Sequence, residues 1–195
     1  MEKETIKERF LGTIFGQAVG DALGLSTEFM SRQEVDQFYP NGIEDYSQIV
    51  QDDHRRRWQR GDWTDDTDMM LCILDSFVAC QKVDTLDIAR RFKEWMMNGG
   101  MGIGRHTYCL DDEKSMGYTL RTLGAALWAY WHATSYKEGI LKIVLSGGDA
   151  DTNATVAGAI LGAKFGICHI PEEWKDGLLY ASMLHNKVQE FYAMV

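Results

Sequence analysis

The sequence predicts an all-α protein, a single compact orthogonal bundle of about seven or eight helices. Apolar residues recur at intervals of three and four along most of the 195 residues, the spacing that places them on one face of a helix. Only Pro40 and Pro171 interrupt the chain, so few positions break a helix. Little of the sequence is left for long strands.

The first helix is expected over residues 6–25, with glycines at every fourth position: Gly12, Gly16, Gly20 and Gly24. A glycine inside a helix costs about 1 kcal/mol relative to alanine, so this row predicts that another element packs very close to the helix backbone. The spacing returns at Gly158, Gly162 and Gly166. A membrane dimer face is disfavoured because Gln17 and Asp21 interrupt the segment.

Capping patterns predict where further helices begin. Ser31 with Glu34 and Ser135 with Glu138 have the spacing of capping boxes. Asp84 precedes a periodic apolar run that predicts a helix to Met97, and Asn98-Gly99-Gly100 should end that helix. Pro171 suits the first turn of a later helix. Residues 120–130 are strongly apolar and predict a central helix buried on more than one side, while residues 41–62 and 98–114 are expected to form loops.

The composition predicts one soluble globular domain over residues 1–195. Lys and Arg number 20 against 29 Asp and Glu, a net charge of −9, which disfavours binding to duplex nucleic acid. No apolar run is long enough for a membrane span, and the charged start lacks the apolar core of a signal peptide, so we expect a cytoplasmic protein without membrane contact.

Cysteine and histidine spacing argues against a disulfide framework or a zinc site. The cysteines contain no C-x-x-C pair, and the histidines show no H-x-H or H-x-x-x-H spacing. The scattered residues are Cys72, Cys80, Cys109 and Cys168, with His54, His106, His132, His169 and His185. A site built on imidazole or thiolate ligands is therefore not expected.

Two acidic segments, residues 61–68 (GDWTDDTD) and 146–153 (SGGDADTN), stand at expected helix starts. Helix capping explains either one alone, since Asp and Thr satisfy free N–H groups in a first turn. Each segment, however, offers two close carboxylates and a hydroxyl, and four converging carboxylates need a hard divalent cation, Mg²⁺, Mn²⁺ or Ca²⁺. An EF-hand is excluded because Ala154 and Ile160 replace its required Gly and Glu.

Three blocks of the sequence resemble the ADP-ribosylglycohydrolase family. They are residues 16–24 (GQAVGDALG) continuing to 27–29 (TEF), residues 63–67 (WTDDT) and residues 147–154 (GGDADTNA). Residues 117–129 and 171–174 are also similar to the closing helices of that family, so the resemblance covers most of the chain.

The resemblance implies an all-helical fold of the ADP-ribosylglycohydrolase type and a centre of two Mg²⁺ or Mn²⁺ ions. Its implied ligands are Thr64, Asp65, Asp66, Asp149, Asp151 and Thr152. Two such ions clamp the vicinal hydroxyls of a ribose and orient a water molecule. The implied catalytic residues are Glu28, the family's active-site glutamate, together with Asp66 and Asp151, one of which moves the proton.

The resemblance also implies substrate contacts by Glu28, Gly148 and the glycine-rich loop at Gly102, Ile103 and Gly104. Glycine N–H groups approach a pyrophosphate closely, although the residues alone favour a plain helix-ending loop. The basic segment 54–60 (HRRRWQR) is expected either to reach the diphosphate or an anionic partner, or to be a solvated loop.

The family pattern is shortened in the middle of this chain. After Tyr108 most members continue through a long helical segment that lines the substrate cleft, whereas here residues 109–114 lead directly to residues 115–118. The resemblance therefore implies a metal-dependent hydrolase that cleaves the N- or O-glycosidic bond between ADP-ribose and a modified acceptor. The alternative is a catalytically silent ADP-ribose-binding or regulatory module, and a homodimer that completes the cleft is a further expectation.

Overall fold

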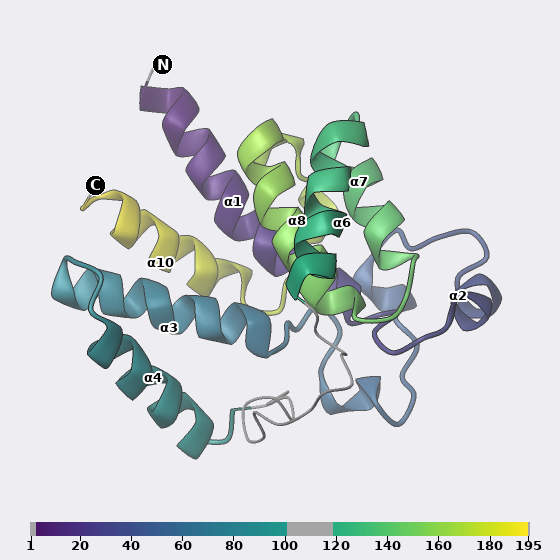
Figure 1. Ribbon diagram of the computed structural model, residues 1–195, viewed down its shortest axis with the longest axis horizontal. Coiled ribbons are helices and arrows are strands. Elements are labelled where there is room, and N and C mark those ends of the chain that lie inside the picture. The colour runs from purple at the N-terminus through teal and green to yellow at the C-terminus, as the bar shows by residue number, and fades with distance from the viewer. Residues whose placement is uncertain (1–2, 101–118, 195) are drawn as a thin grey trace.

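The computed structural model describes residues 3–100 and 119–194, and every regular element in those ranges is helical (Figure 1). The all-α prediction is thereby confirmed. In chain order the elements are α1 (Lys3–Gly24), α2 (Arg32–Phe38), η1 (Tyr46–Gln48), η2 (Arg55–Arg57), α3 (Asp65–Cys80), α4 (Thr85–Met97), α6 (Thr119–His132), α7 (Tyr136–Val144), α8 (Ala150–Phe165), η3 (Ile167–His169), α9 (Glu172–Asp176) and α10 (Ala181–Tyr192).

The glycine rows of α1 and α8 face each other, and the two helix backbones touch. A Cβ on Gly12 would lie 2.3 Å from the carbonyl oxygen of Gly162, and one on Gly20 would lie 2.1 Å from that of Ala154. Higher numbers on α1 meet lower numbers on α8, so the two helices run antiparallel. The predicted close approach is confirmed, and a side chain at these positions has no room.

The α1–α8 pair is the centre around which the other helices pack. Figure 1 shows α6 and α7 on the α8 side of the pair and α3 with α10 on the α1 side, and the contacts between elements agree. The core includes the fully buried Tyr136, Leu161 and Trp174. Tyr136 donates a hydrogen bond from its hydroxyl to the Gly16 carbonyl at 2.7 Å, which ties α7 to α1.

Most predicted helix ends are confirmed. Ser31 forms the expected capping box with Glu34, and Asp84 caps α4, which ends at Met97. Ser135 caps α7, but Glu138 returns to the backbone N–H of Thr134 rather than to that of Ser135, so the box is only half formed. The helix after Pro171 begins one residue later than expected, at Glu172.

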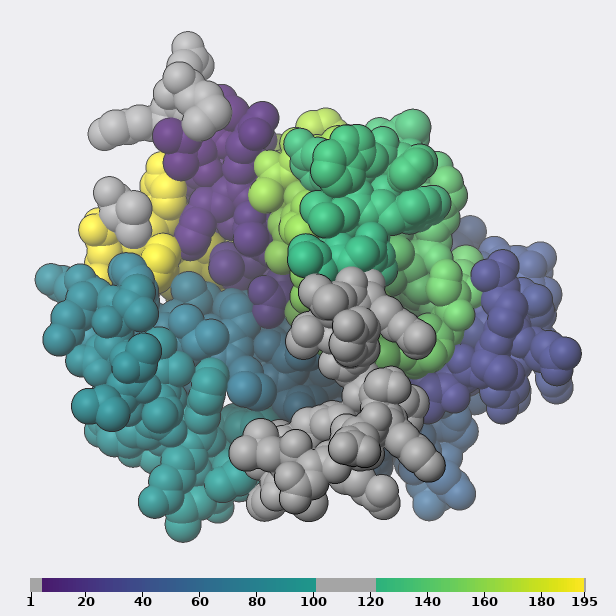
Figure 2. All heavy atoms as spheres, in the orientation of Figure 1, coloured from purple at the N-terminus to yellow at the C-terminus, as the bar shows by residue number. Residues whose placement is uncertain are grey.

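The prediction that residues 120–130 are buried on more than one side is wrong. Ala126 and Ala129 of α6 pack inward and are fully buried. The large apolar side chains instead lie on the opposite face, where Trp128 is 43% and Trp131 is 70% exposed, and α6 lies at the front of the molecule in Figure 2. Small residues suffice for close packing of α6 on α8. The apolar composition of residues 120–130 therefore overestimates how much of the α6 surface is buried.

The described residues also test the predicted loop at residues 41–62 and the expectation that no segment spans a membrane. The predicted loop over residues 41–62 is irregular apart from the short turns η1 and η2. No described helix is long and apolar enough to cross a membrane. Residues 101–118 lie outside the described ranges, and with them the predicted substrate loop at Gly102, Ile103 and Gly104.

Candidate metal centre

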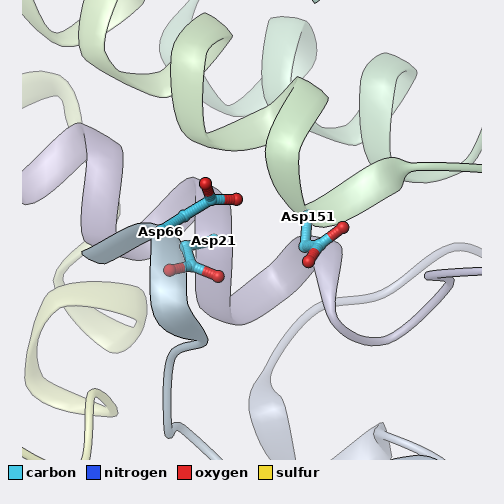
Figure 3. Close-up of side chains that lie close together, drawn as sticks. All are labelled: Asp21, Asp66 and Asp151. Atoms are coloured by element: carbon cyan, nitrogen blue, oxygen red, sulfur yellow. The ribbon is translucent and has the colours of Figure 1, made fainter. Parts of the chain in front are cut away.

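Three carboxylates from three helices meet at one point (Figure 3). Asp66 belongs to the first turn of α3, Asp151 to the first turn of α8, and Asp21 to the C-terminal part of α1. One ligand atom from each lies within 4.8 Å of the others, a spacing that fits a metal ion. Two of the six predicted ligands are thus brought together, and Asp21 joins them without having been predicted.

Asp21 is fully buried and positions the start of α3 against α1. It accepts hydrogen bonds from the backbone N–H and the hydroxyl of Thr64, at 3.1 and 2.8 Å, and from those of Thr67, at 3.0 and 2.6 Å. Burial and the nearby charge of Asp66 raise the pKa of Asp21 to about 8, against the effect of these hydrogen bonds. The sequence indication was available: a lone Asp between Gly20 and Gly24 in an otherwise apolar row.

Asp151 carries the clearest indication of a cation site. Its Oδ1 atom is buried and has no hydrogen-bond partner among the residues that the structure describes. Burial above all, and then the surrounding carboxylates, raise the pKa of Asp151 well above its ordinary value. An unpaired buried carboxylate oxygen is costly, and no Lys, Arg or His of the described residues forms an ion pair with Asp21, Asp66 or Asp151. A divalent cation would satisfy this oxygen and offset the repulsion.

Helix capping does not account for the two acidic segments. At α3 the cap is Thr64, whose hydroxyl accepts from the N–H of Asp66, so the carboxylates that follow are not needed for capping. At α8 the N-cap residue is Asp149, yet its side chain makes no capping hydrogen bond. The alternative explanation considered from the sequence therefore leaves the carboxylates unexplained.

The other predicted ligands surround the three-carboxylate cluster. Burial and then Asp66 raise the pKa of Asp65 to about 7. Burial also raises the pKa of Asp66, while a hydrogen bond from Thr152 opposes the shift and the charge of Asp149 adds to it. Asp65, Asp149 and Thr152 are thus close enough to interact with the cluster electrostatically or by hydrogen bonding, although the three-residue group itself does not include them.

Glu28 and Gly148 lie on two loops that are tied together beside the cluster. The N–H of Phe29 donates to the Gly148 carbonyl at 2.6 Å, and the N–H of Gly148 donates to the Met30 carbonyl at 2.9 Å. Glu28 is buried, and its charge contributes to the raised pKa values of Asp65, Asp66 and Asp151. Both predicted substrate-contacting residues therefore lie near the start of α8.

The basic segment at residues 54–60 holds the Glu28 loop, a role that neither sequence interpretation included. Arg55 is only 3% exposed and donates to the carbonyls of Leu25 and Ser26 at 3.0 and 2.8 Å, and also to that of Glu28. His54 Nε2 lies 2.6 Å from Glu28 Oε2. The segment is thus not simply a solvated loop, and Arg55 is not free to reach a diphosphate because it is committed to the protein backbone.

Comparison with known proteins identifies the family of this chain. The family model described as ADP-ribosylglycohydrolase matches residues 2–111 and 106–194. The chain belongs to the ADP-ribosylglycohydrolase family. It is also similar in fold to a solved structure named ADP-ribosylglycohydrolase-related protein complex, with a TM-score of 0.75 at 20% identity over 98% of this chain and 99% of that one.

Three curated relatives of this ADP-ribosylglycohydrolase-family chain carry functional names. It is 36% identical over 84 residues to an ADP-ribosylarginine hydrolase of Serratia proteamaculans and 34% identical over 82 residues to that of Pseudomonas putida. These matches cover 43% and 42% of this chain but only 23% and 22% of the relatives. It is 22% identical to the ADP-ribosyl-(dinitrogen reductase) glycohydrolase of Rhodospirillum rubrum, over 91% of this chain and 92% of that protein.

The comparisons also agree with the predicted shortening of this family member. The alignment with the Rhodospirillum rubrum protein spans 284 positions, more than the 195 residues of this chain, so it contains long gaps in this chain. The family match falls into two parts that overlap at residues 106–111, a stretch that includes Tyr108, after which the longer segment was expected.

Proposed function

We propose that the protein is a metal-dependent hydrolase that cleaves the N- or O-glycosidic bond between ADP-ribose and a modified acceptor. The observation that carries this proposal is the cluster of Asp21, Asp66 and Asp151, with its buried and unpaired Asp151 Oδ1, in a chain of the ADP-ribosylglycohydrolase family. The names of the curated relatives, which are hydrolases of ADP-ribosylated arginine and of a modified protein, support the reaction class.

The residues present fit a hard divalent cation. Carboxylate and hydroxyl oxygens are the donors that Mg²⁺ and Mn²⁺ prefer, and the three-carboxylate cluster contains no Cys or His ligand that would favour zinc. We propose two such ions, held by Asp66 and Asp151 with Thr64, Asp65, Asp149 and Thr152, and we add Asp21 to this set. Bound there, they would supply positive charge for clamping ribose hydroxyls and acidifying water.

Within this proposal, carboxylates of the protein transfer the proton, and the backbone at Gly148 admits the substrate. Glu28, Asp66 and Asp151 are the carboxylates that can move the proton needed for cleavage. Glu28 is held at 2.6 Å by His54 Nε2 and is buried, so it keeps one orientation beside the cluster. At Gly148, apart from its chain neighbours, no atom of the described residues lies within 4 Å of the place that a Cβ would occupy. Its φ is +72°, and its backbone is open to close approach by the substrate.

The test is release of free ADP-ribose, measured by mass, from a panel of ADP-ribosylated arginine, serine and nucleic-acid substrates. We expect release with Mg²⁺ or Mn²⁺ and none with a chelator. Asp66→Asn and Asp151→Asn should abolish release, whereas Asp36→Asn, at an exposed carboxylate on α2, should not change it. Full metal-dependent turnover by the two cluster variants would refute the site. Saturable ADP-ribose binding without release from any acceptor would favour the silent binding module instead.

A further inference from the structure

The imidazole of His54 lies between an arginine and a glutamate. On one side its Nε2 atom lies 2.6 Å from Oε2 of Glu28, one of the buried carboxylates proposed to move a proton. On the other side Nη2 of Arg57 contacts its Nδ1 atom. Both ring nitrogens are therefore engaged, and a chain of contacts runs from an exposed arginine to the Glu28 carboxylate.

Aromatic rings hold the imidazole and the guanidinium in this arrangement. The ring centroid of His54 lies 5.1 Å from that of Phe29 and 5.3 Å from that of Trp58. The Arg57 guanidinium lies over the Trp58 ring, 4.6 Å from its centroid, and Nε of Arg57 donates to the His54 carbonyl at 2.9 Å. The contact between Arg57 and the imidazole is thus supported from several sides.

Arg57 differs from the arginines beside it in its choice of partner. Arg55 and Arg56 each form an ion pair with a nearby aspartate. In the described part of the chain Arg57 forms no ion pair with a carboxylate, and the hydrogen bonds of its side chain both go to His54. Its guanidinium is therefore committed to the imidazole rather than to a surface ion pair.

The hydrogen-bonding chemistry of these groups determines which nitrogen of His54 carries a proton. A guanidinium only donates hydrogen bonds, so Nδ1 beside Arg57 must be the acceptor and carries no proton. A neutral imidazole then carries its single proton on Nε2, from which it donates to Glu28 Oε2. A doubly protonated ring would direct an N–H group and a second positive charge at the guanidinium. Oε2 is therefore occupied as an acceptor, while Oε1 accepts no hydrogen bond from the described residues.

We propose that Arg57 is a positioning residue that fixes this tautomer of His54, so that Glu28 keeps Oε2 on His54 and exchanges a proton through Oε1. The inference rests on the hydrolase function proposed above, and it selects Glu28 among the carboxylates that can move the proton. Oε1 takes a proton from the attacking water, whose oxygen bonds to the anomeric carbon. The bond from that carbon to the acceptor breaks, and the acceptor atom leaves with the electron pair and receives the proton from Oε1.

NMR of the full protein, labelled with ¹⁵N at its histidines, tests the tautomer without any reaction. The His54 signals are those missing from the spectrum of His54→Gln. At neutral pH we expect an unprotonated Nδ1 and a protonated Nε2 in the wild-type protein. A proton on Nδ1 of the wild-type protein would overturn the proposal, whether or not any variant of Arg57 folds.

Variants of Arg57 test whether this residue causes the tautomer. In Arg57→Leu, which keeps an apolar side chain near Trp58 but has no donor, Nδ1 should be protonated in a detectable fraction of molecules. Arg57→Lys should keep the wild-type signals, because an ammonium also only donates. The matched control is Arg56→Gln, which removes an exposed arginine that pairs with Asp53 and should leave the signals of His54 unchanged. Unchanged signals in folded Arg57→Leu would overturn the proposal.

A kinetic measurement separates this positioning role from the hydrolase function. With a substrate that the wild-type protein cleaves, Arg57→Leu should lower kcat about fivefold with KM unchanged, a smaller loss than in His54→Gln because the imidazole is still present. Arg57→Lys should restore most of the loss, and Arg56→Gln should show none. An unchanged kcat in Arg57→Leu, or a loss that lysine does not restore, would overturn the positioning role and leave the hydrolase intact. Failure of the proposed function would appear differently, as no release of ADP-ribose by the wild-type protein, and the NMR spectra would still decide whether Arg57 fixes the tautomer.

Discussion

The carbonyl oxygen of Gly158 lies 2.3 Å from the place that a Cβ on Gly16 would occupy, and the Gly16 carbonyl lies 2.0 Å from the corresponding place on Gly158. This mutual contact brings the backbones of α1 and α8 together. Asp21 lies near the C-terminal end of α1, and Asp151 lies near the N-terminal end of α8. Because the helices are antiparallel, both carboxylates lie at the same end of the pair. The helix packing therefore sets the separation of two carboxylates of the candidate metal centre.

Gly158→Ala should destabilise the protein by about 3 kcal/mol, because the added methyl group overlaps the Gly16 backbone and neither helix can give way without moving the other. Urea unfolding measures the change. The matched control is Gly124→Ala on α6, where no described atom outside the helix's own nearby backbone lies within 4 Å of the added atom. Better helix propensity should there add up to about 1 kcal/mol of stability. Equal effects of the two substitutions would contradict the packing argument.

Added Mn²⁺ should raise the melting temperature of the wild-type protein, because the ion binds the folded cluster and not the unfolded chain. At a free Mn²⁺ concentration one hundred times Kd, binding adds about 2.7 kcal/mol to the free energy of unfolding. Asp151→Asn should remove most of this stabilisation. It should also make the metal-free protein more stable, since a neutral side chain replaces a buried carboxylate surrounded by others. Differential scanning calorimetry with and without Mn²⁺ gives both values, and a stabilisation retained in the variant would count against the site.

The metal-free protein should lose stability as the pH rises from about 4 to 8. Burial raises the pKa of Asp21 to about 8 and that of Asp65 to about 7, so the folded protein keeps protons that the unfolded chain releases above its ordinary pKa of 3.8. The unfolded state then binds fewer protons than the folded state in this window, and the free energy of unfolding falls with pH until both groups ionise.

Urea unfolding in a chelator at intervals between pH 4 and pH 8 measures this dependence. Asp65→Asn should flatten the part of the curve below about pH 7, because it removes one of the carboxyl groups whose pKa burial raises. Asp36→Asn, on the exposed surface of α2, should leave the slope as it is. If the metal-free protein instead gains stability between pH 4 and pH 8, the folded state binds fewer protons than the unfolded state. That result would disprove the raised pKa values of Asp21 and Asp65.

His54→Gln should lower kcat about tenfold with little change in the free energy of unfolding, because His54 orients Glu28 across a distance of 2.6 Å and is not itself part of the core. It should also alter the pH profile of kcat, which a purely structural contact would not do. His169→Gln, at an exposed histidine in η3, is the control. An unchanged pH profile together with unchanged kcat would show that Glu28 does not need this partner.

Much of the fold could be predicted because local chemistry determines it. The glycine rows indicated the α1–α8 contact, since close backbone packing is what compensates for glycine inside a helix. Asp66 and Asp151 were found because each belongs to a short acidic segment at a helix start. Ser31 and Asp84 were found because a capping side chain acts within its own first turn.

What the sequence did not disclose depends on contacts between distant segments. Asp21 became part of the cluster only because the orientation of α1 points it at the first turn of α3. His54 and Arg55 hold the Glu28 loop across 26 and 27 positions of chain, which spacing arguments do not reach. The exposed Trp131 shows that an apolar run does not reveal which of its faces packs inward.

Anomalous diffraction from crystals grown with Mn²⁺ and ADP-ribose tests the central claim most directly. We expect Mn²⁺ at about 2.0–2.3 Å from carboxylate oxygens of Asp66 and Asp151, with the ribose hydroxyls beside it. These oxygens should include Asp151 Oδ1, which has no hydrogen-bond partner in the described part of the chain. Manganese bound elsewhere, or ADP-ribose bound in a site that contains no metal, would contradict the account.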